Sequence, residues 1–211
     1  FYYAQPGNEA AVLRQRLHAS DVREKLAIPR GRVMRRTAGA ATLPDVIWEL
    51  QFAEIAGHHA DMAVRAASPE FEAVRAGMRK LCRRFERPLF EICADTLASR
   101  SQNARIVTLE WIFCTPDGTE KILDVLRRQI NYDAPGRLLR LTTPGNDLPQ
   151  LLWQREHVDA RSADARVQCR VEISGTDRID VTSSNFGGLK VGALSSANFQ
   201  SASSTLTSRA A

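Results

Sequence analysis

The chain has 211 residues, of which 44% are hydrophobic, so it is long enough to bury the core of one large domain or two small ones. Its formal net charge of +5 comes from 25 arginines and four lysines against 24 acidic residues, and most arginines are interspersed with Asp and Glu. No apolar run reaches the roughly 18 residues of a membrane-spanning helix. The four cysteines form no C-x-x-C pair, which argues against a zinc site or a disulfide-rich scaffold and predicts a reduced, cytoplasmic setting.

The beginning of the chain predicts a strand, a helix and two more strands. They are expected at residues 1–4, from Glu9 through Leu17, at 32–36 and at 46–52. The last strand alternates, with Val46, Trp48, Leu50 and Phe52 on one face and Ile47, Glu49 and Gln51 on the other. Because Phe1 already stands inside a strand, we expect the natural amino terminus to precede it.

A divided helix and a closing strand complete the first unit. The first helical piece is expected at 53–65, and Ser68 is the expected N-cap of the second piece, with Pro69 at its first position. Apolar residues recur there at steps of three and four, and the basic cluster at 79–84 is expected on the same helix as a solvated face, with nucleic acid or an anionic ligand as the alternative. With a strand at 88–92 the order is β-α-β-β-α-β, the split βαβ or ferredoxin-like unit.

Residues 136–153 repeat residues 31–48. At an offset of 105 the two segments share seven of eighteen residues, including Gly31/Gly136 and Trp48/Trp153. The second copy predicts a strand at 106–113, a helix with Ile122 and Leu126, strands at 137–141 and 151–157, and a hairpin at 167–181. We therefore expect a first unit at 1–95, a linker at 96–104, a degenerate second unit at 105–186 and a poorly ordered Gly/Ser/Ala-rich tail at 187–211.

Three motifs resemble the dimeric α/β-barrel superfamily. They are the W-E-x-x-F strand with Trp48, Glu49 and Phe52, the helix restart A-S-P-E-F at 67–71 and the closing R-R-F-E-R-P-L-F at 83–90. The superfamily includes the antibiotic-biosynthesis monooxygenase-like, NIPSNAP-like, EthD-like and stress-responsive barrel families. The resemblance implies an α+β fold in which the helix-free faces of two sheets form a barrel, here as a pseudo-dimer within one chain that is able to dimerise again. It carries no catalytic residue across, because these families do not share one.

An uncovered sheet face with large apolar side chains must be buried, since exposing it costs about 25 cal/mol per Å². A barrel that covers it is able to enclose a small apolar or aromatic ligand. The candidate ligand-binding residues are Trp48, Glu49, Gln51, Trp153 and Gln154. For each of them core packing or a half-exposed sheet face is the competing interpretation, and the sequence leaves open which strand face lines the barrel.

His157 is the candidate catalytic residue, as a general base with an unperturbed pKa near 6.5, and a solvent-facing strand residue is the alternative. The pair His58-His59 with Asp61 resembles part of a metal site, but adjacent helical residues diverge by about 100°, so no metal is expected. No organic cofactor is expected either, because the sequence contains neither a Walker loop nor a G-x-G-x-x-G motif.

Three function classes remain open. The first is a non-catalytic or stress-associated small-molecule binder, and the second is a cofactor-independent oxygenase, isomerase or cyclase acting on an aromatic or polyketide-like compound. The third is an RNA-binding module, which residues 45–52 do not favour because they lack the RNP1-like run that combines a basic residue and a glycine with spaced aromatics.

Overall fold

The computed structural model describes residues 1–97, 106–114, 116–130, 136–143, 148–157, 170–173, 177–180 and 192–202. It is an α+β protein whose chain divides into two compact units. The first is built mainly from Phe1–Arg36 and Ala41–Arg87, and the second mainly from Pro88–Gln200. No helix in the described ranges is long and apolar enough to cross a membrane.

The first unit follows the predicted order of elements. Its elements are β1 (Tyr2–Ala4), α1 (Glu9–Lys25), β2 (Arg32–Ala38), β3 (Val46–Glu49), α2 (Ile55–Ala66), α3 (Pro69–Leu81) and β4 (Cys82–Phe85). The strands lie in the order β4-β1-β3-β2, and each neighbouring pair is antiparallel. The two strands nearest the middle of the order, β1 and β3, are therefore neighbours although α1 and β2 separate them in sequence.

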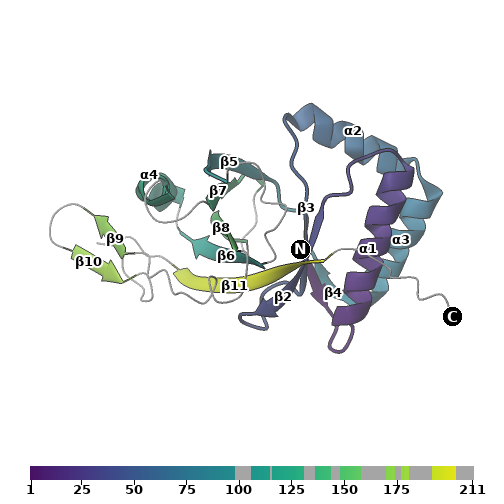
Figure 1. The fold of residues 1–211 in the computed structure, drawn as a ribbon, viewed down its shortest axis with the longest axis horizontal. Helices are drawn as coiled ribbons and strands as arrows, with labels where there is room; N and C mark the ends of the chain where they lie inside the picture. The colour runs from purple at the N-terminus through teal and green to yellow at the C-terminus, as the bar shows by residue number, and fades with distance from the viewer. Residues whose placement is uncertain are drawn as a thin grey trace. The chain divides into compact units, whose positions relative to one another are not determined.

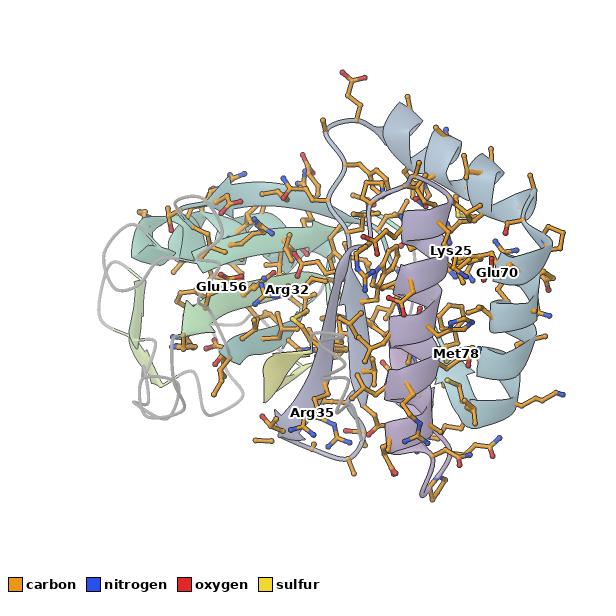
Figure 2. All side chains as sticks on the ribbon, turned by 45° about the vertical axis from the view of Figure 1, so that its right-hand side comes forward. Lys25, Arg32, Arg35, Glu70, Met78 and Glu156 are labelled. Atoms are coloured by element: carbon orange, nitrogen blue, oxygen red, sulfur yellow. The ribbon has the colours of Figure 1, made fainter. Side chains whose placement is uncertain are left out.

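Helices α1 and α3 lie side by side against one face of this sheet (Figure 1). The core between them contains Val12 of α1 and Met78 of α3, packed against Val46 of β3. Figure 2 shows Lys25 and Glu70 pointing toward each other from the two helices, and their Nζ and Oε1 atoms are 2.8 Å apart. The apolar residues that recur along α3 therefore face the sheet, as the sequence predicts.

The N-cap of α3 is confirmed. The Ser68 hydroxyl accepts a hydrogen bond of 3.1 Å from the backbone N–H of Phe71, and Pro69 opens the helix. We expect Ser68→Ala to lower the free energy of unfolding by about 1 kcal/mol, measured by urea denaturation, because an N–H of the first turn then loses its partner. Asn8 precedes α1 without a side-chain capping bond, so Asn8→Ala is the control with a smaller expected effect. Equal losses in both variants would contradict a contribution from the Ser68 hydroxyl.

The predicted closing strand of the first unit is wrong. β4, which begins directly after α3, pairs with β1, whereas β5 (Phe90–Asp95) pairs with β7 (Gly136–Leu141) in the second unit. The basic cluster is consequently divided, because α3 ends at Leu81 and leaves Arg83 and Arg84 in β4. The apolar spacing that defines the helix stops at Leu81, and only long-range pairing decides between two nearby short strands.

The second unit has a related order of elements with one described helix. After β5 it contains β6 (Ile106–Phe113), α4 (Pro116–Ile130), β7, β8 (Leu151–His157), β9 (Arg170–Ile173), β10 (Asp177–Asp180) and β11 (Gly192–Ala202). The strand order is β11-β6-β8-β7-β5, again antiparallel at each pair. The predicted hairpin is confirmed by the antiparallel pairing of β9 with β10, and its turn lies outside the described residues.

The strand register follows the sequence repeat. Arg32 lies opposite Glu49 in the first unit, and Arg137 lies opposite Gln154 in the second. Both residues of the second pair follow those of the first pair by 105 positions. The first strands follow a different offset of 110, since Tyr2 lies opposite Val46 and Ile112 opposite Leu151.

Part of the predicted tail forms a strand. Gly192–Ala202 is β11 and pairs with β6. Its position beside β6 corresponds to that of β4 beside β1. Small residues do not predict a strand, because they bury little apolar surface of their own. Residues 187–191 and 203–211 of the predicted tail lie outside the described residues.

Candidate functional site

The residues that pack beneath the helices show which face of each sheet is covered by helices and which is helix-free. Trp48 and Val46 pack in the core below α1 and α3, so alternation along β3 places Ile47 and Glu49 on the face without helices. In the second unit Trp153 packs in the core with residues of α4, so Gln154 lies on the helix-free face of β8. The sequence left this choice open, and the structure separates the tryptophans from the polar candidates.

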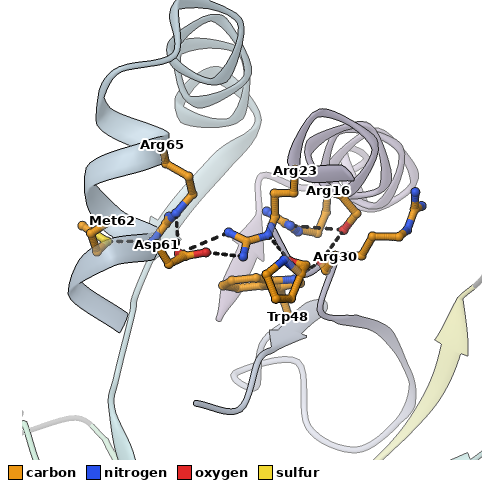
Figure 3. A network of polar contacts seen from close by, with 9 residues as sticks. Arg16, Arg23, Arg30, Trp48, Asp61, Met62 and Arg65 are labelled. Carbon is orange, nitrogen blue, oxygen red and sulfur yellow. Dashed lines mark hydrogen bonds and ion pairs between the residues drawn. The ribbon is translucent and has the colours of Figure 1, made fainter. Parts of the chain in front are cut away.

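Trp48 is held in place by its surroundings rather than presented to a ligand (Figure 3). Its indole Nε1 donates a hydrogen bond of 2.9 Å to the carbonyl oxygen of Arg30, and the guanidinium carbons of Arg16 and Arg23 lie 4.5 and 4.7 Å from the ring centroid. A Cβ at Gly31 would lie 2.2 Å from Nε1, so only glycine leaves room for the indole. These contacts make Trp48 a packing residue between β3 and α1.

A buried ion cluster connects α1 and α2 behind Trp48. Asp61 of α2 forms an ion pair with Arg23 of α1, and its Oδ2 accepts a hydrogen bond of 2.7 Å from Nε of Arg65 (Figure 3). Arg23, Asp61 and Arg65 are 0%, 4% and 6% exposed. Since Asp61 already serves two arginines, the structure does not bring it together with His58 and His59 as metal ligands. Among the described residues no group of three potential metal ligands is found.

Trp153 repeats the position of Trp48 with different neighbours. It packs with Leu138 and Leu151 below α4, and a Cβ at Gly136 would lie 2.8 Å from its Nε1. The guanidinium carbon of Arg155 lies 4.7 Å from its ring centroid. Each copy therefore combines a glycine, a tryptophan and at least one arginine, which explains two of the identities in the sequence repeat.

His157 ends β8 on the same face as Trp153. Its Nε2 lies 3.2 Å from the hydroxyl oxygen of Thr108 on β6, and the residue is half-buried. Alternation places its side chain on the opposite face from Gln154 and Glu156. The structure therefore does not bring the candidate base together with the polar candidates of the helix-free face.

A row of four residues crosses four strands on the helix-free face of the second unit, and three of the four are polar. Gln154 of β8 lies between Leu109 of β6 and Arg137 of β7, and Arg137 lies opposite Asp95 of β5. Nη2 of Arg137 and Oδ2 of Asp95 form an ion pair of 2.7 Å. Gln154 is 1% exposed and Arg137 is 4% exposed. We call Gln154, Arg137 and Asp95 the polar row.

Apolar side chains border the polar row. The next row on the same face joins Trp111, Leu152, Leu139 and Ile92 across the same four strands. On the other side the apolar Val107 lies opposite the acidic Glu156, so this border is mixed. An amide and an Arg–Asp pair thus stand within a mainly apolar surface, the composition that orients small ligands in protein sites.

The first unit carries a related pair on its helix-free face. Arg32 and Glu49 lie opposite each other, at the positions that Arg137 and Gln154 occupy in the second unit. Gln51 follows the end of β3 and is exposed, so it lies outside this sheet. The predicted strand to Phe52 was too long by three residues, and Gln51 is not on a strand face as the prediction assumed.

The described cysteines are poor nucleophiles. Burial raises the pKa of the thiols of Cys82, Cys93 and Cys114. A raised pKa leaves less thiolate near neutral pH, and the thiolate is the reactive form. These positions therefore do not suit covalent catalysis.

Sequence reasoning missed Arg137 and Asp95. The identity of Arg32 and Arg137 in the repeat was the available signal, but it did not show which face the arginine occupies. Asp95 follows a strand that was assigned to the wrong unit, so its pairing with Arg137 was not foreseeable. A comparison with protein-family models gives no match for this chain, and neither does a comparison with curated proteins.

Proposed function

We propose that the chain is a tandem ferredoxin-like protein of the dimeric α/β-barrel type and that it binds a small, largely apolar or aromatic molecule without catalysing a reaction. The observation that carries this proposal is the polar row, in which the buried amide of Gln154 and the Arg137–Asp95 pair lie within an apolar, helix-free sheet face.

The strand order supports the fold assigned in this proposal. The order β4-β1-β3-β2, with α1 and α3 on one face, is the arrangement of a split βαβ unit. β11-β6-β8-β7 has the same pattern in the second unit, and the register of its β7–β8 pair repeats that of β2–β3. A duplication accounts for both features more simply than two unrelated sheets would.

The chemistry of the polar row supports ligand binding. Burying an amide or a charged pair costs free energy that well-packed apolar side chains of similar size would not. A face used for packing alone gains nothing from Gln154 and Arg137. A ligand that is mostly apolar but carries one hydrogen-bonding group would use both the polar row and the apolar residues beside it.

The non-catalytic assignment follows from where the candidate base lies. His157 contacts Thr108 on the face that carries Trp153, away from Gln154. A base must reach the proton that it removes, at about 3 Å or through one water molecule. A ligand on the helix-free face is therefore out of reach of His157, which is why the oxygenase, isomerase or cyclase alternative is not the function proposed.

Native mass spectrometry of the protein purified from its own host tests the proposal. We expect the wild type to carry a retained small molecule and Gln154→Leu to retain at least tenfold less of it, since a polar group on the ligand then loses its hydrogen-bond partner. Gln51→Leu is the matched control, because it makes the same chemical change at an exposed position off the sheet.

Two results would contradict the proposal. One is a wild-type protein that retains no small molecule, and the other is a ligand whose retention does not differ between the Gln154→Leu and Gln51→Leu variants. If a ligand is present and turned over, and His157→Ala abolishes the turnover, the catalytic alternative replaces the non-catalytic one.

A further inference from the structure

Among the described residues Arg16 is a buried cation without a carboxylate partner. It lies on α1 and is 4% exposed. Its guanidinium donates to the hydroxyls of Tyr2 at 3.5 Å and Ser20 at 3.2 Å and stacks on Trp48, and its Nε has no hydrogen-bond partner among the described residues. Arginine is almost never fully buried unless it is paired, because an uncompensated buried charge is costly. None of the described residues that Arg16 contacts carries a negative charge.

The buried carboxylate of this unit is already engaged. Asp61 accepts hydrogen bonds from both Arg23 and Arg65, and the three residues leave one positive charge uncompensated even before Arg16 is considered. Asp61 therefore does not supply the missing charge at Arg16.

More positive charge gathers near Tyr2. The Arg87 guanidinium lies 4.7 Å over the ring of Phe85, and that ring lies 4.9 Å from the ring of Tyr2. No hydrogen bond or ion pair joins Arg87 to any residue that the structure describes. Nearby, Arg75 and Arg79 share one carboxylate, that of Glu72, at 3.1 and 3.4 Å.

These arginines act on one another electrostatically. Burial is the main cause of the lowered pKa of Arg16, and the charges of Arg23 and Arg87 lower it further. Desolvation lowers the pKa of Arg87 first, and Arg75 and Arg79 add to that effect. For both Arg16 and Arg87 the Tyr2 hydroxyl is the main group that raises the pKa instead. Arg16 contacts Tyr2 directly and Arg87 reaches it through the ring of Phe85, so both cations lie near the same tyrosine.

We propose that Arg16, Arg87 and the Tyr2 hydroxyl bind a small oxyanion of the phosphate type. Arg87 is exposed and Arg16 is buried, so an anion arriving from solvent meets Arg87 first and Arg16 at greater depth. The burial of Arg16 limits the ligand to a small ion or the terminal group of a small molecule. This site lies on the helix side of the first sheet and is independent of the polar row.

The charge balance favours a dianion over a carboxylate. In the interactions above, Arg75, Arg79 and Arg87 share one described acid, Glu72, and Arg16 contacts none. Phosphate carries about two negative charges near neutral pH and presents oxygens in several directions, as two guanidinium groups and a hydroxyl require. Acetate compensates only one charge and presents two oxygens in one plane.

The second copy supplies the test variant. With the offset of 110 that relates Tyr2 to Ile112, Leu126 of α4 corresponds to Arg16 of α1 and is buried in the core of its unit. The second unit therefore accommodates leucine at this place. Arg16→Leu is thus a substitution that the same architecture already contains, and it removes the proposed anion ligand.

Isothermal titration calorimetry of the full chain with inorganic phosphate, at low ionic strength and mildly alkaline pH, tests the site. We expect saturable binding of one phosphate per chain, weakened at least tenfold by Arg16→Leu and by Arg87→Gln. Arg14→Leu is the control, because Arg14 lies on the same helix, is exposed, and loses the same charge. We expect acetate to bind at least tenfold more weakly than phosphate.

Three results would overturn the proposal: no saturable phosphate binding by the wild type, equal weakening by Arg14→Leu and Arg16→Leu, or acetate binding as tightly as phosphate. If Arg16→Leu does not fold, Arg87→Gln decides alone, since the exposed Arg87 is not part of the core. Unchanged affinity in Arg87→Gln then refutes the site.

Discussion

Replacing Asp61 by alanine is expected to destabilise the first unit by about 3–5 kcal/mol, because it leaves Arg23 and Arg65 buried without their shared carboxylate. The side chains of Arg23 and Asp61 are 0% and 3% exposed, so water cannot take over the role of the lost carboxylate. This loss of stability measures the cost of leaving two arginine charges buried and unpaired. It does not equal the stabilisation that the ion pair itself provides. Asp61→Asn, which keeps an acceptor oxygen, should cost less than Asp61→Ala.

Urea denaturation followed by circular dichroism measures this loss, and hydrogen exchange in α1 and α2 assigns it to the first unit. Glu70→Ala is the control, since Glu70 also joins two helices by an ion pair but is exposed, with 47% of its side chain accessible. Its loss should be at most about 1 kcal/mol. Similar losses in the two variants would mean that burial of the Asp61 cluster does not govern its contribution.

Elements with a strong local period could be predicted from the sequence. Helix α3 is an example, because its apolar residues recur at helical spacing up to Leu81 and Ser68 marks its N-cap. Both features appear in the structure. The pairing of β5 with β7 could not be predicted, because Phe90–Asp95 and Cys82–Phe85 are both short and either suits the edge of a sheet. The choice depends on contacts with strands far away in sequence.

The candidate site could be predicted only in part. Gln154 and Glu49 were identified as polar residues on sheet strands, and the structure places both on helix-free faces. Trp48 was a candidate ligand-binding residue with core packing as the alternative, and in the structure Arg16, Arg23 and the Arg30 carbonyl surround it. A strand pattern shows which side chains share a face and does not show what a helix later places against them.

The same limit explains why the roles of Arg16 and Asp61 were not predicted from the sequence. Arg16 and Leu126 occupy corresponding helix positions but have opposite chemistry, and aligning them requires the offset of 110 rather than 105. Asp61 was considered as a metal ligand because of its neighbours in sequence, whereas its partners in space are arginines. Chemistry that spans two helices is not visible in a local motif.

Replacing Gly31 by alanine is expected to cost about 2–5 kcal/mol, from two separate sources. The residue has a φ of 71°, which costs an alanine about 1–2 kcal/mol, and a Cβ there would lie 2.2 Å from Trp48 Nε1 and 2.8 Å from the Glu49 carbonyl oxygen. Relieving that overlap requires moving the indole or the strand, and overpacking of this kind costs about 1–3 kcal/mol.

Two other glycines separate these sources. Gly7 has a φ of 84°, but a Cβ added there would meet nothing within 4 Å, so Gly7→Ala should report the backbone cost alone. At Gly136 a Cβ would lie 2.8 Å from Trp153 Nε1 without a positive φ, so Gly136→Ala should report the steric cost alone. Urea unfolding of the three variants, with hydrogen exchange to assign each unit, makes the comparison.

The loss in Gly31→Ala should then approach the sum of the other two. A loss no greater than that of Gly7→Ala would show that the indole yields without cost, and that its hydrogen bond to Arg30 does not fix the distance between the two strands. A loss near the sum would show instead that the Gly–Trp pair, which both copies contain, sets the distance between β2 and β3 and between β7 and β8. That constraint holds Glu49 and Gln154 at equivalent positions on the helix-free faces, although the helices behind them have diverged.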